Sequence, residues 1–354
     1  MRRLLLTLVA APLVLAAGGG AAASSCVEDL PLRWKAAQVL MPAVYGPEVE
    51  AQGERWARLG LGGALVMTAP DDLAGGPLLR FKQRSTVPVL VATDEEGGTV
   101  QRLRSLGRLP GAATMAGSRS PVAARSEVVA HALRVKATGV DVVFAPVVDV
   151  SPPGGGGPIE RRAFSSNPWQ VLAYGKAYVD AWRLAEVLPV VKHFPGHGSA
   201  TGDTHVVGAR TASLDELRRR DLVPFKGLAG SGTGVMVGHL EVPGLTEPDR
   251  PASVSPAALR YLRSAAGYRR ALVFSDSLGM AAISQRWDLA TAVEETIKAG
   301  VDMAVFTTSS GVEVVIDRLV QAVEQGRIPA ARLDDAVGRV LAAKRVDACA
   351  LAVS

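Results

Sequence analysis

The chain has 354 residues, of which 48% are hydrophobic and 21% charged, so it is long enough to bury the core of one large α/β domain. Its 39 basic and 34 acidic residues leave a net charge of +5, with no block of like charges. A nucleic-acid partner is not expected, because the sequence has no basic stripe with interleaved aromatic residues.

The chain begins with a pattern typical of a secretory signal peptide over residues 1–25. Arg2 and Arg3 precede an apolar run at 4–17, and small residues follow it as far as Ala23. That run is shorter than the roughly 20 residues that a membrane-spanning helix needs, and no later segment is apolar enough to span a bilayer. We therefore expect a secreted or cell-envelope protein in which residues 26–354 form one folded domain. A retained N-terminal anchor is the alternative.

Two cysteines lie near opposite ends of the expected mature chain, at Cys26 and Cys349. In an exported protein such a pair favours a disulfide, and closure of a barrel would bring the first and last elements side by side. Lipidation of Cys26 is the alternative. A lipoprotein signal usually has leucine three positions before the cysteine, whereas this chain has Ala23 there.

Short apolar runs, most of them rich in β-branched residues, recur along the chain, and each is followed by a loop and a helix-like stretch. Continuous apolar runs of this length are typical of parallel strands that are buried on both faces. Eight such strands alternating with helices predict a (β/α)8 TIM-type barrel of the α/β class, with an open doubly wound sheet as the alternative. The predicted strands are 39–45, 62–67, 87–93, 140–146, 188–193, 234–239, 271–276 and 301–306. The predicted helices include 127–138, 168–184, 214–228, 289–299 and 311–326.

The stretch 151–168, which follows the fourth predicted strand, contains two prolines and four consecutive glycines. We predict an irregular loop on the face of the barrel where active sites lie. Arg161, Arg162 and Phe164 near its end are candidates for recognition.

Polar residues concentrate where four of the predicted strands end. Residues 94–102 follow the third strand, 192–198 follow the fifth, His239 ends the sixth and Asp276 ends the seventh. Because the carboxyl ends of barrel strands meet at one rim, we expect these groups, His239 among them, to face a substrate in one cleft. Taken singly, each could cap a helix or satisfy a structural hydrogen bond.

Four of the five histidines fall in these loops together with Asp276, so a metal-dependent hydrolase is one alternative. No His-x-His pair ends the first strand, and the segment 193–197, with its two prospective ligands, is not helical. We therefore expect no metal and no other cofactor. The histidines concerned are His193, His197, His205 and His239.

These motifs resemble those of glycoside hydrolase family 3, in the branch of bacterial single-domain β-N-acetylglucosaminidases. The sequence KHFPGHG at 192–198, followed by GDTH at 202–205, resembles the signature of that branch. Residues 94–102, DEEGGTVQR, resemble its sugar-binding loop, and 274–278, FSDSL, resemble its nucleophile strand. The chain departs from the family's usual pattern at Thr99, at Ser277 and within 162–165.

The resemblance implies a retaining, exo-acting enzyme that removes terminal β-linked N-acetylglucosamine from peptidoglycan fragments. It implies that Asp276 is the nucleophile and that His205, oriented by Asp203, is the general acid and base. A secreted sugar-binding protein that has lost catalysis is an alternative of a different class, and a monomer is the default state. The residues implied to hold the sugar are Asp94, Arg102, Arg162, Lys192 and His193.

Three glycines surround the implied acid/base pair, at Gly198, Gly202 and Gly208. A loop of this composition can move. We therefore expect Asp203 and His205 to swing over bound sugar and to lie away from Asp276 otherwise.

Overall fold

The computed structural model describes residues 26–68, 76–157 and 159–352. The predicted signal peptide therefore lies outside the described residues. Within them, no helix is both long and apolar enough to cross a membrane.

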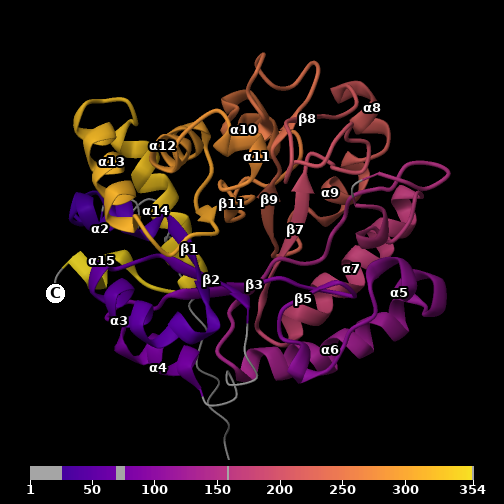
Figure 1. The fold of residues 1–354 in the computed structure, drawn as a ribbon, viewed down its shortest axis with the longest axis horizontal. Coiled ribbons are helices and arrows are strands. Elements are labelled where there is room, and N and C mark those ends of the chain that lie inside the picture. Colours follow the sequence, from indigo (N-terminus) through magenta and orange to yellow (C-terminus); the bar gives the residue numbers. More distant parts are fainter. Residues whose placement is uncertain (1–25, 69–75, 158, 353–354) are drawn as a thin grey trace, which may run out of the picture.

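Eight parallel strands form the centre of the molecule, as the sequence predicted (Figure 1). Neighbours in the sheet follow chain order, and backbone hydrogen bonds such as Ser275 N to Met303 O, at 3.0 Å, join the last two strands and close the ring. The fold is a (β/α)8 barrel. Its strands are β1 (Leu40–Tyr45), β2 (Gly63–Thr68), β3 (Leu90–Thr93), β6 (Val142–Val143), β7 (Leu188–Phe194), β9 (Gly234–Val237), β11 (Val273–Ser275) and β12 (Ala304–Phe306).

The strands read as unbroken apolar runs because both of their faces are buried. In β1, Met41 and Ala43 point into the barrel interior, while Leu40 and Val44 pack against the outer helices. Phe144 and Phe274 meet edge to face inside the barrel, with ring centroids 5.4 Å apart. The interior is therefore a packed core beneath the rim, not a channel.

Helices surround the barrel (Figure 1). Two of the predicted helices were close to the observed bounds, since α7 matches 168–184 and α12 matches 289–299. The helices are α2 (Leu32–Gln38), α3 (Val49–Leu59), α4 (Pro77–Arg84), α5 (Ala112–Ser118), α6 (Pro121–Ala137), α7 (Pro168–Leu184), α8 (Leu214–Arg219), α9 (Leu222–Leu228), α10 (Pro256–Arg263), α11 (Ala281–Ser284), α12 (Leu289–Ala299), α13 (Val312–Glu324), α14 (Ala330–Lys344) and α15 (Ala348–Ala352).

The helix predicted over 214–228 was wrong in one respect, because the structure breaks it into α8 and α9 at Arg220. Arg220 has φ −133° and ψ −76°, outside the helical region. Its guanidinium donates to the backbone oxygens of Val150 and Ser151 and, at 2.6 Å, to Ser199 Oγ. Contacts to distant loops, which local periodicity does not contain, therefore determine the break.

Two short sheets lie in the loops that follow β3, β7 and β9. The antiparallel pair β4 (Glu95–Gly97) and β5 (Val100–Gln101) folds the segment after β3 into a hairpin. The parallel pair β8 (Ala209–Arg210) and β10 (Leu240–Glu241) ties the loop after β7 to the loop after β9. Both sheets give the loops that carry the site residues a fixed backbone.

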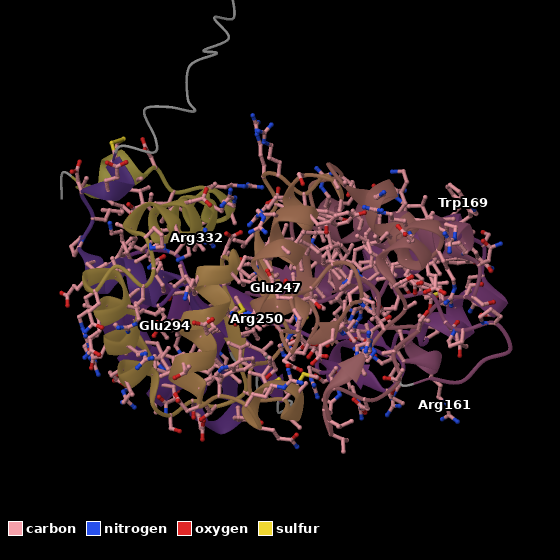
Figure 2. The ribbon with its side chains drawn as sticks, turned by 90° about the horizontal axis from the view of Figure 1, so that it is seen from above. Arg161, Trp169, Glu247, Arg250, Glu294 and Arg332 are labelled. Carbon is pink, nitrogen blue, oxygen red and sulfur yellow. A yellow bond between two sulfur atoms is a disulfide. The ribbon has the colours of Figure 1, made fainter. Side chains whose placement is uncertain are left out.

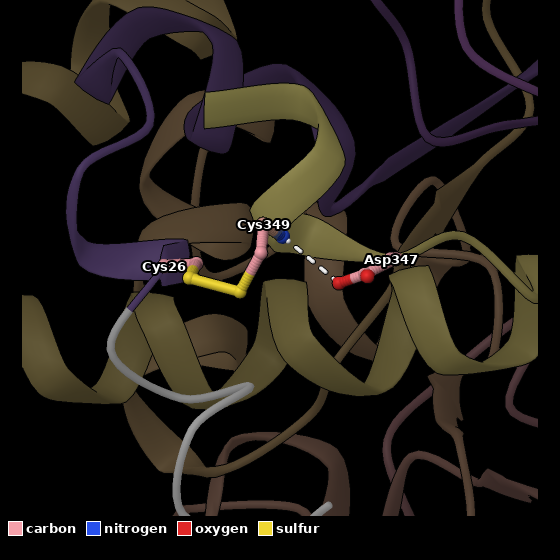
Figure 3. The surroundings of a disulfide bond; sticks show 3 residues. All are labelled: Cys26, Asp347 and Cys349. Carbon is pink, nitrogen blue, oxygen red and sulfur yellow. Dashed lines mark hydrogen bonds between the residues drawn. A yellow bond between two sulfur atoms is a disulfide. The ribbon is translucent and has the colours of Figure 1, made fainter. Parts of the chain in front are cut away.

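The predicted disulfide between Cys26 and Cys349 is present, with the two Cα atoms 4.9 Å apart (Figure 3). α2, near the start of the described chain, packs against α14, near its end, as expected when a barrel closes. The Cys349 backbone N–H also donates to Asp347 Oδ1 at 3.0 Å (Figure 3).

Candidate active site

A cavity of about 480 Å³ opens at the carboxyl ends of the strands. Its wall includes both charged groups from the loops and apolar side chains from the top of the barrel interior, such as Leu65, Phe144 and Met236. Seven of the predicted site residues line it: Asp94, Arg102, Arg162, Lys192, His193, His205 and Asp276. Groups that are far apart in the sequence therefore meet at one rim, as the strand-end pattern predicted.

Lys192 is the centre of a buried ion cluster on one side of the cavity. Its Nζ lies 2.7 Å from Asp94 Oδ1 and 2.6 Å from Glu96 Oε1, and its side chain is 3% exposed. Burial favours the neutral amine, but the carboxylates of Asp94 and Glu96 outweigh it and raise the pKa of Lys192. The ammonium group therefore stays charged and held in place.

Glu96 also lines the cavity, and the sequence analysis did not single it out. Its carboxylate accepts two hydrogen bonds from Arg162, at 2.8 and 2.9 Å, and contacts Lys192. Burial opposes ionisation, yet Lys192 and Arg162 lower the pKa of Glu96 to about 2. Arg102 completes the cluster with a longer contact to Asp94 of 3.4 Å. Glu96 thus orients two cations at the cavity wall.

A second buried layer supports His193, and Asp149 is its hub. Asp149 is fully buried and accepts from His193 Nδ1 at 2.7 Å and from the backbone N–H of His197 at 2.6 Å. Because Nδ1 carries the proton, His193 Nε2 can accept, and Arg162 lies 3.3 Å from it. Burial opposes ionisation of Asp149, but His193 outweighs it and lowers the pKa of that carboxyl. The sequence analysis missed Asp149, although a charged residue within the apolar run 147–150 was a usable signal.

Asp276 directly follows β11 and lines the cavity. Burial would raise the pKa of Asp276, but His193, His239, the Ser277 backbone N–H and Lys192 together lower it to about 2. The Ser277 N–H donates to Asp276 Oδ1 at 2.8 Å. The structure therefore presents an ionised, oriented carboxylate at the rim.

The structure does not place His239 in the cavity, where we expected it to face a substrate. His239 is 1% exposed and does not line the cavity. One ring nitrogen, Nδ1, bonds to Ser253 Oγ at 2.8 Å, and the other, Nε2, donates to Ser277 O at 2.9 Å. Because both ring nitrogens bond to other residues of the protein, His239 is not free to bond a substrate. It instead holds the backbone of Ser277, the residue next to Asp276. A strand-end position predicts nearness to the site but not the side of the backbone to which a side chain turns.

The Asp203 and His205 pair forms as predicted. Asp203 Oδ1 accepts from His205 Nδ1 at 2.7 Å and from the His205 backbone N–H at 2.9 Å. These bonds outweigh partial burial and lower the pKa of Asp203. His205 lines the same cavity as Asp276, whereas Asp203 does not line it. His205 is therefore not in the withdrawn position that we expected.

Residues 151–157 and 159–167 are irregular, as predicted, apart from a short 3-10 helix at Glu160–Arg162. Only one of the three candidate recognition residues, Arg162, reaches the cavity. Arg161 is exposed and projects from the edge of the molecule (Figure 2). Phe164 packs in the core against Tyr174 and Tyr178, with ring centroids 5.4 and 5.0 Å away. The recognition role predicted for Arg161 and Phe164 is therefore not supported.

Among residues 26–68, 76–157 and 159–352, no group of three or more His, Cys, Asp or Glu side chains is arranged to hold a metal ion.

Comparisons with known proteins agree with this geometry. Residues 73–343 match the model of the glycosyl hydrolase family 3 N terminal domain. Over 278 residues the chain is 44% identical to the β-hexosaminidase LpqI of Mycobacterium tuberculosis, covering 76% of this chain and 69% of that protein.

Solved structures give the same relationship. A glycosyl hydrolase of the GH3 family from Mycobacterium smegmatis superposes with a TM-score of 0.85 at 38% identity, covering 90% of this chain and 98% of that one. A family 3 β-N-acetylglucosaminidase from Paenibacillus has a TM-score of 0.84 at 28% identity, covering 89% of this chain and 62% of that one.

Proposed function

Because the chain belongs to glycosyl hydrolase family 3 and is therefore a glycoside hydrolase, we propose that it removes terminal β-linked N-acetylglucosamine from cell-wall fragments with retention of configuration. The observation that carries the proposal is the meeting of Asp276 and His205 in one cavity with the Lys192 ion cluster. The activities for which the relatives are named, β-hexosaminidase and β-N-acetylglucosaminidase, support the choice of sugar. The signal-peptide pattern at 1–25 supports an exported enzyme that meets wall fragments outside the cytoplasm.

Asp276 is the proposed nucleophile. A retaining glycosidase needs a carboxylate that attacks the anomeric carbon and forms a covalent glycosyl ester, while the leaving oxygen is protonated. With its pKa near 2, Asp276 is ionised throughout the physiological range. The Ser277 N–H holds Oδ1, so the carboxylate is oriented before the sugar binds.

His205 is the proposed acid and base. Its Nδ1–H is committed to Asp203, which leaves Nε2 as the nitrogen that gives a proton to the departing oxygen and later takes one from water. The donor in this enzyme class is usually a second carboxylic acid; here the Asp203 carboxylate orients an imidazole instead.

The ion cluster is the proposed site for the terminal sugar. Asp94, Glu96, Arg162 and Lys192 present charged donors and acceptors at the cavity wall, and charged partners make the stronger hydrogen bonds to sugar hydroxyls. Their mutual pairing keeps each side chain in place without sugar, so little ordering remains for the binding step. The apolar wall at Leu65, Phe144 and Met236 gives the remainder of the ring an apolar surface.

The proposal is tested with a chromogenic N-acetylglucosaminide. We expect turnover by the unmodified enzyme and loss of at least about a thousandfold in Asp276→Asn, which keeps the shape but removes the attacking charge. Binding of N-acetylglucosamine without turnover in the unmodified protein would instead favour a sugar-binding protein that has lost catalysis.

A further inference from the structure

Thr204, which lies between the two members of the acid/base pair, is the one buried residue of the segment 201–208. It is 1% exposed, whereas the side chains of Asp203 and His205 are 47% and 62% exposed. Its neighbours therefore face the cavity or solvent while its own side chain turns into the protein. A small polar residue buried at the tip of a surface loop needs a partner inside.

Two interactions hold Thr204. Its hydroxyl Oγ1 lies 3.1 Å from His197 Nε2, and its backbone oxygen accepts from the Ala282 N–H, at the start of α11, at 3.2 Å. The first contact joins the loop tip to the segment directly after β7. The second joins it to the segment that follows the nucleophile strand, β11.

His197 is a rigid anchor for this contact. Its backbone N–H donates to Asp149 at 2.6 Å, and its ring meets that of His193 edge to face, with centroids 5.8 Å apart. Burial lowers the pKa of His197, and proximity to His193 lowers it further, so the ring is neutral near pH 7. Within the described residues His197 Nδ1 has no hydrogen-bond partner. Since a buried N–H without an acceptor is costlier than a lone pair without a donor, Nε2 is the nitrogen that carries the proton and donates to Thr204.

We propose that Thr204 and His197 form a latch that holds the Asp203 and His205 pair at the cavity, which makes Thr204 a positioning residue for proton transfer. This inference rests on the proposed acid/base role of His205. The same Asp149 layer that orients His193 toward the sugar also fixes His197. The latch therefore fixes the position of the acid/base pair relative to the proposed sugar-binding groups.

The test compares Thr204→Val, which keeps the shape but loses the hydroxyl, with Thr204→Ser, which keeps the hydroxyl. For an unactivated disaccharide substrate, kcat/KM reports a step that needs the proton from His205. There we expect Thr204→Val to lose about 5- to 10-fold, the range that one net hydrogen bond supplies, while Thr204→Ser stays within about 2-fold. For a dinitrophenyl glycoside, whose leaving group needs no proton, kcat/KM of both variants should stay within about 2-fold.

Two controls make the outcome decisive. If His205→Ala loses kcat/KM selectively on the disaccharide while Thr204→Val loses it equally on both substrates or on neither, the latch is wrong and the acid/base role stands. If His205→Ala loses equally on both substrates, the proposed acid/base role of His205 and the latch both fail, while turnover that depends on Asp276 would leave the proposed glycosidase activity standing.

A double-variant measurement checks that the two residues act through one contact. His197→Phe keeps a ring in the buried position but has no nitrogen to bond Thr204. The double variant with Thr204→Val should be no worse on the disaccharide than the worse single variant, because a shared interaction can be lost only once. Additive losses would overturn the latch. Thermal unfolding of each variant verifies that the protein being assayed is folded.

Discussion

Glu96→Gln tests whether the ion cluster around Lys192 is as strongly ionic as the geometry indicates. The substitution keeps the size of the side chain but removes the charge that bonds Arg162 and Lys192. Glu96 has a pKa of about 2 against an ordinary value of 4.5, so the fold favours the charged form by about 3 kcal/mol at pH 7. We therefore expect the variant to lose roughly that much free energy of unfolding at pH 7.

The pH dependence follows from the sign of the shift. Because the pKa is lower in the folded state, the stabilisation is complete above about pH 4.5 and is lost as the pH falls toward 2. At pH 3.5 the difference between the unmodified protein and the variant should shrink to about 2 kcal/mol.

The assay is urea unfolding at both pH values, with Glu324→Gln as the control. Glu324 is an exposed residue at the end of α13, so the same change of charge there should cost less than about 0.5 kcal/mol. A Glu96→Gln effect below 1 kcal/mol at pH 7, or one that is equal at both pH values, would refute the reasoning.

Three further predictions concern the metal, the disulfide and a buried lysine. Activity should survive exhaustive chelation, whereas a loss that zinc restores would favour a metal-dependent hydrolase. Reduction should increase the mass of the mature protein by two hydrogens, whereas a diacylglyceryl adduct on Cys26 would contradict the disulfide. Replacing Cys26 and Cys349 by serine should lower the free energy of unfolding by up to about 5 kcal/mol, because the bond closes a loop with a sequence separation of 323. Burial lowers the pKa of Lys344 to about 7, and its Nζ bonds only Gln38 Oε1 among the described residues, at 2.5 Å. Below pH 7 the buried lysine is charged at the full cost of its burial, and that cost fades as the pH rises from 7 toward 10.5. Allowing for the lost hydrogen bond to Gln38, Lys344→Met should raise the unfolding free energy by about 2 kcal/mol at pH 6, and the gain should shrink toward pH 10. A net loss at pH 6 would contradict the cost of burial.

The barrel was predictable because its signals are local and repeated. Strands buried on both faces must be apolar at every position, as in β1, and each run is followed by enough chain for a crossover helix. The break at Arg220 was not predictable in this way, since it depends on backbone oxygens of the distant residues Val150 and Ser151.

In the site, too, local patterns predicted some features, and contacts between distant residues determined the others. Strand ends predicted which polar groups meet, and Asp94, Lys192 and Asp276 do meet at one cavity. Strand ends did not predict which side chains turn away from the cavity. His239 bonds Ser253 and the backbone oxygen of Ser277 instead of lining the cavity. The buried layer formed by Asp149 was missed because its partners, in the segment after β7, are more than forty residues away.

The most direct test of the account is to trap the covalent intermediate with a 2-fluoro sugar and to map the modified residue by mass spectrometry. The account predicts a glycosyl ester on Asp276, and none in Asp276→Asn. A label on Asp94, Glu96 or any other carboxylate, with Asp276 unmodified, would contradict it.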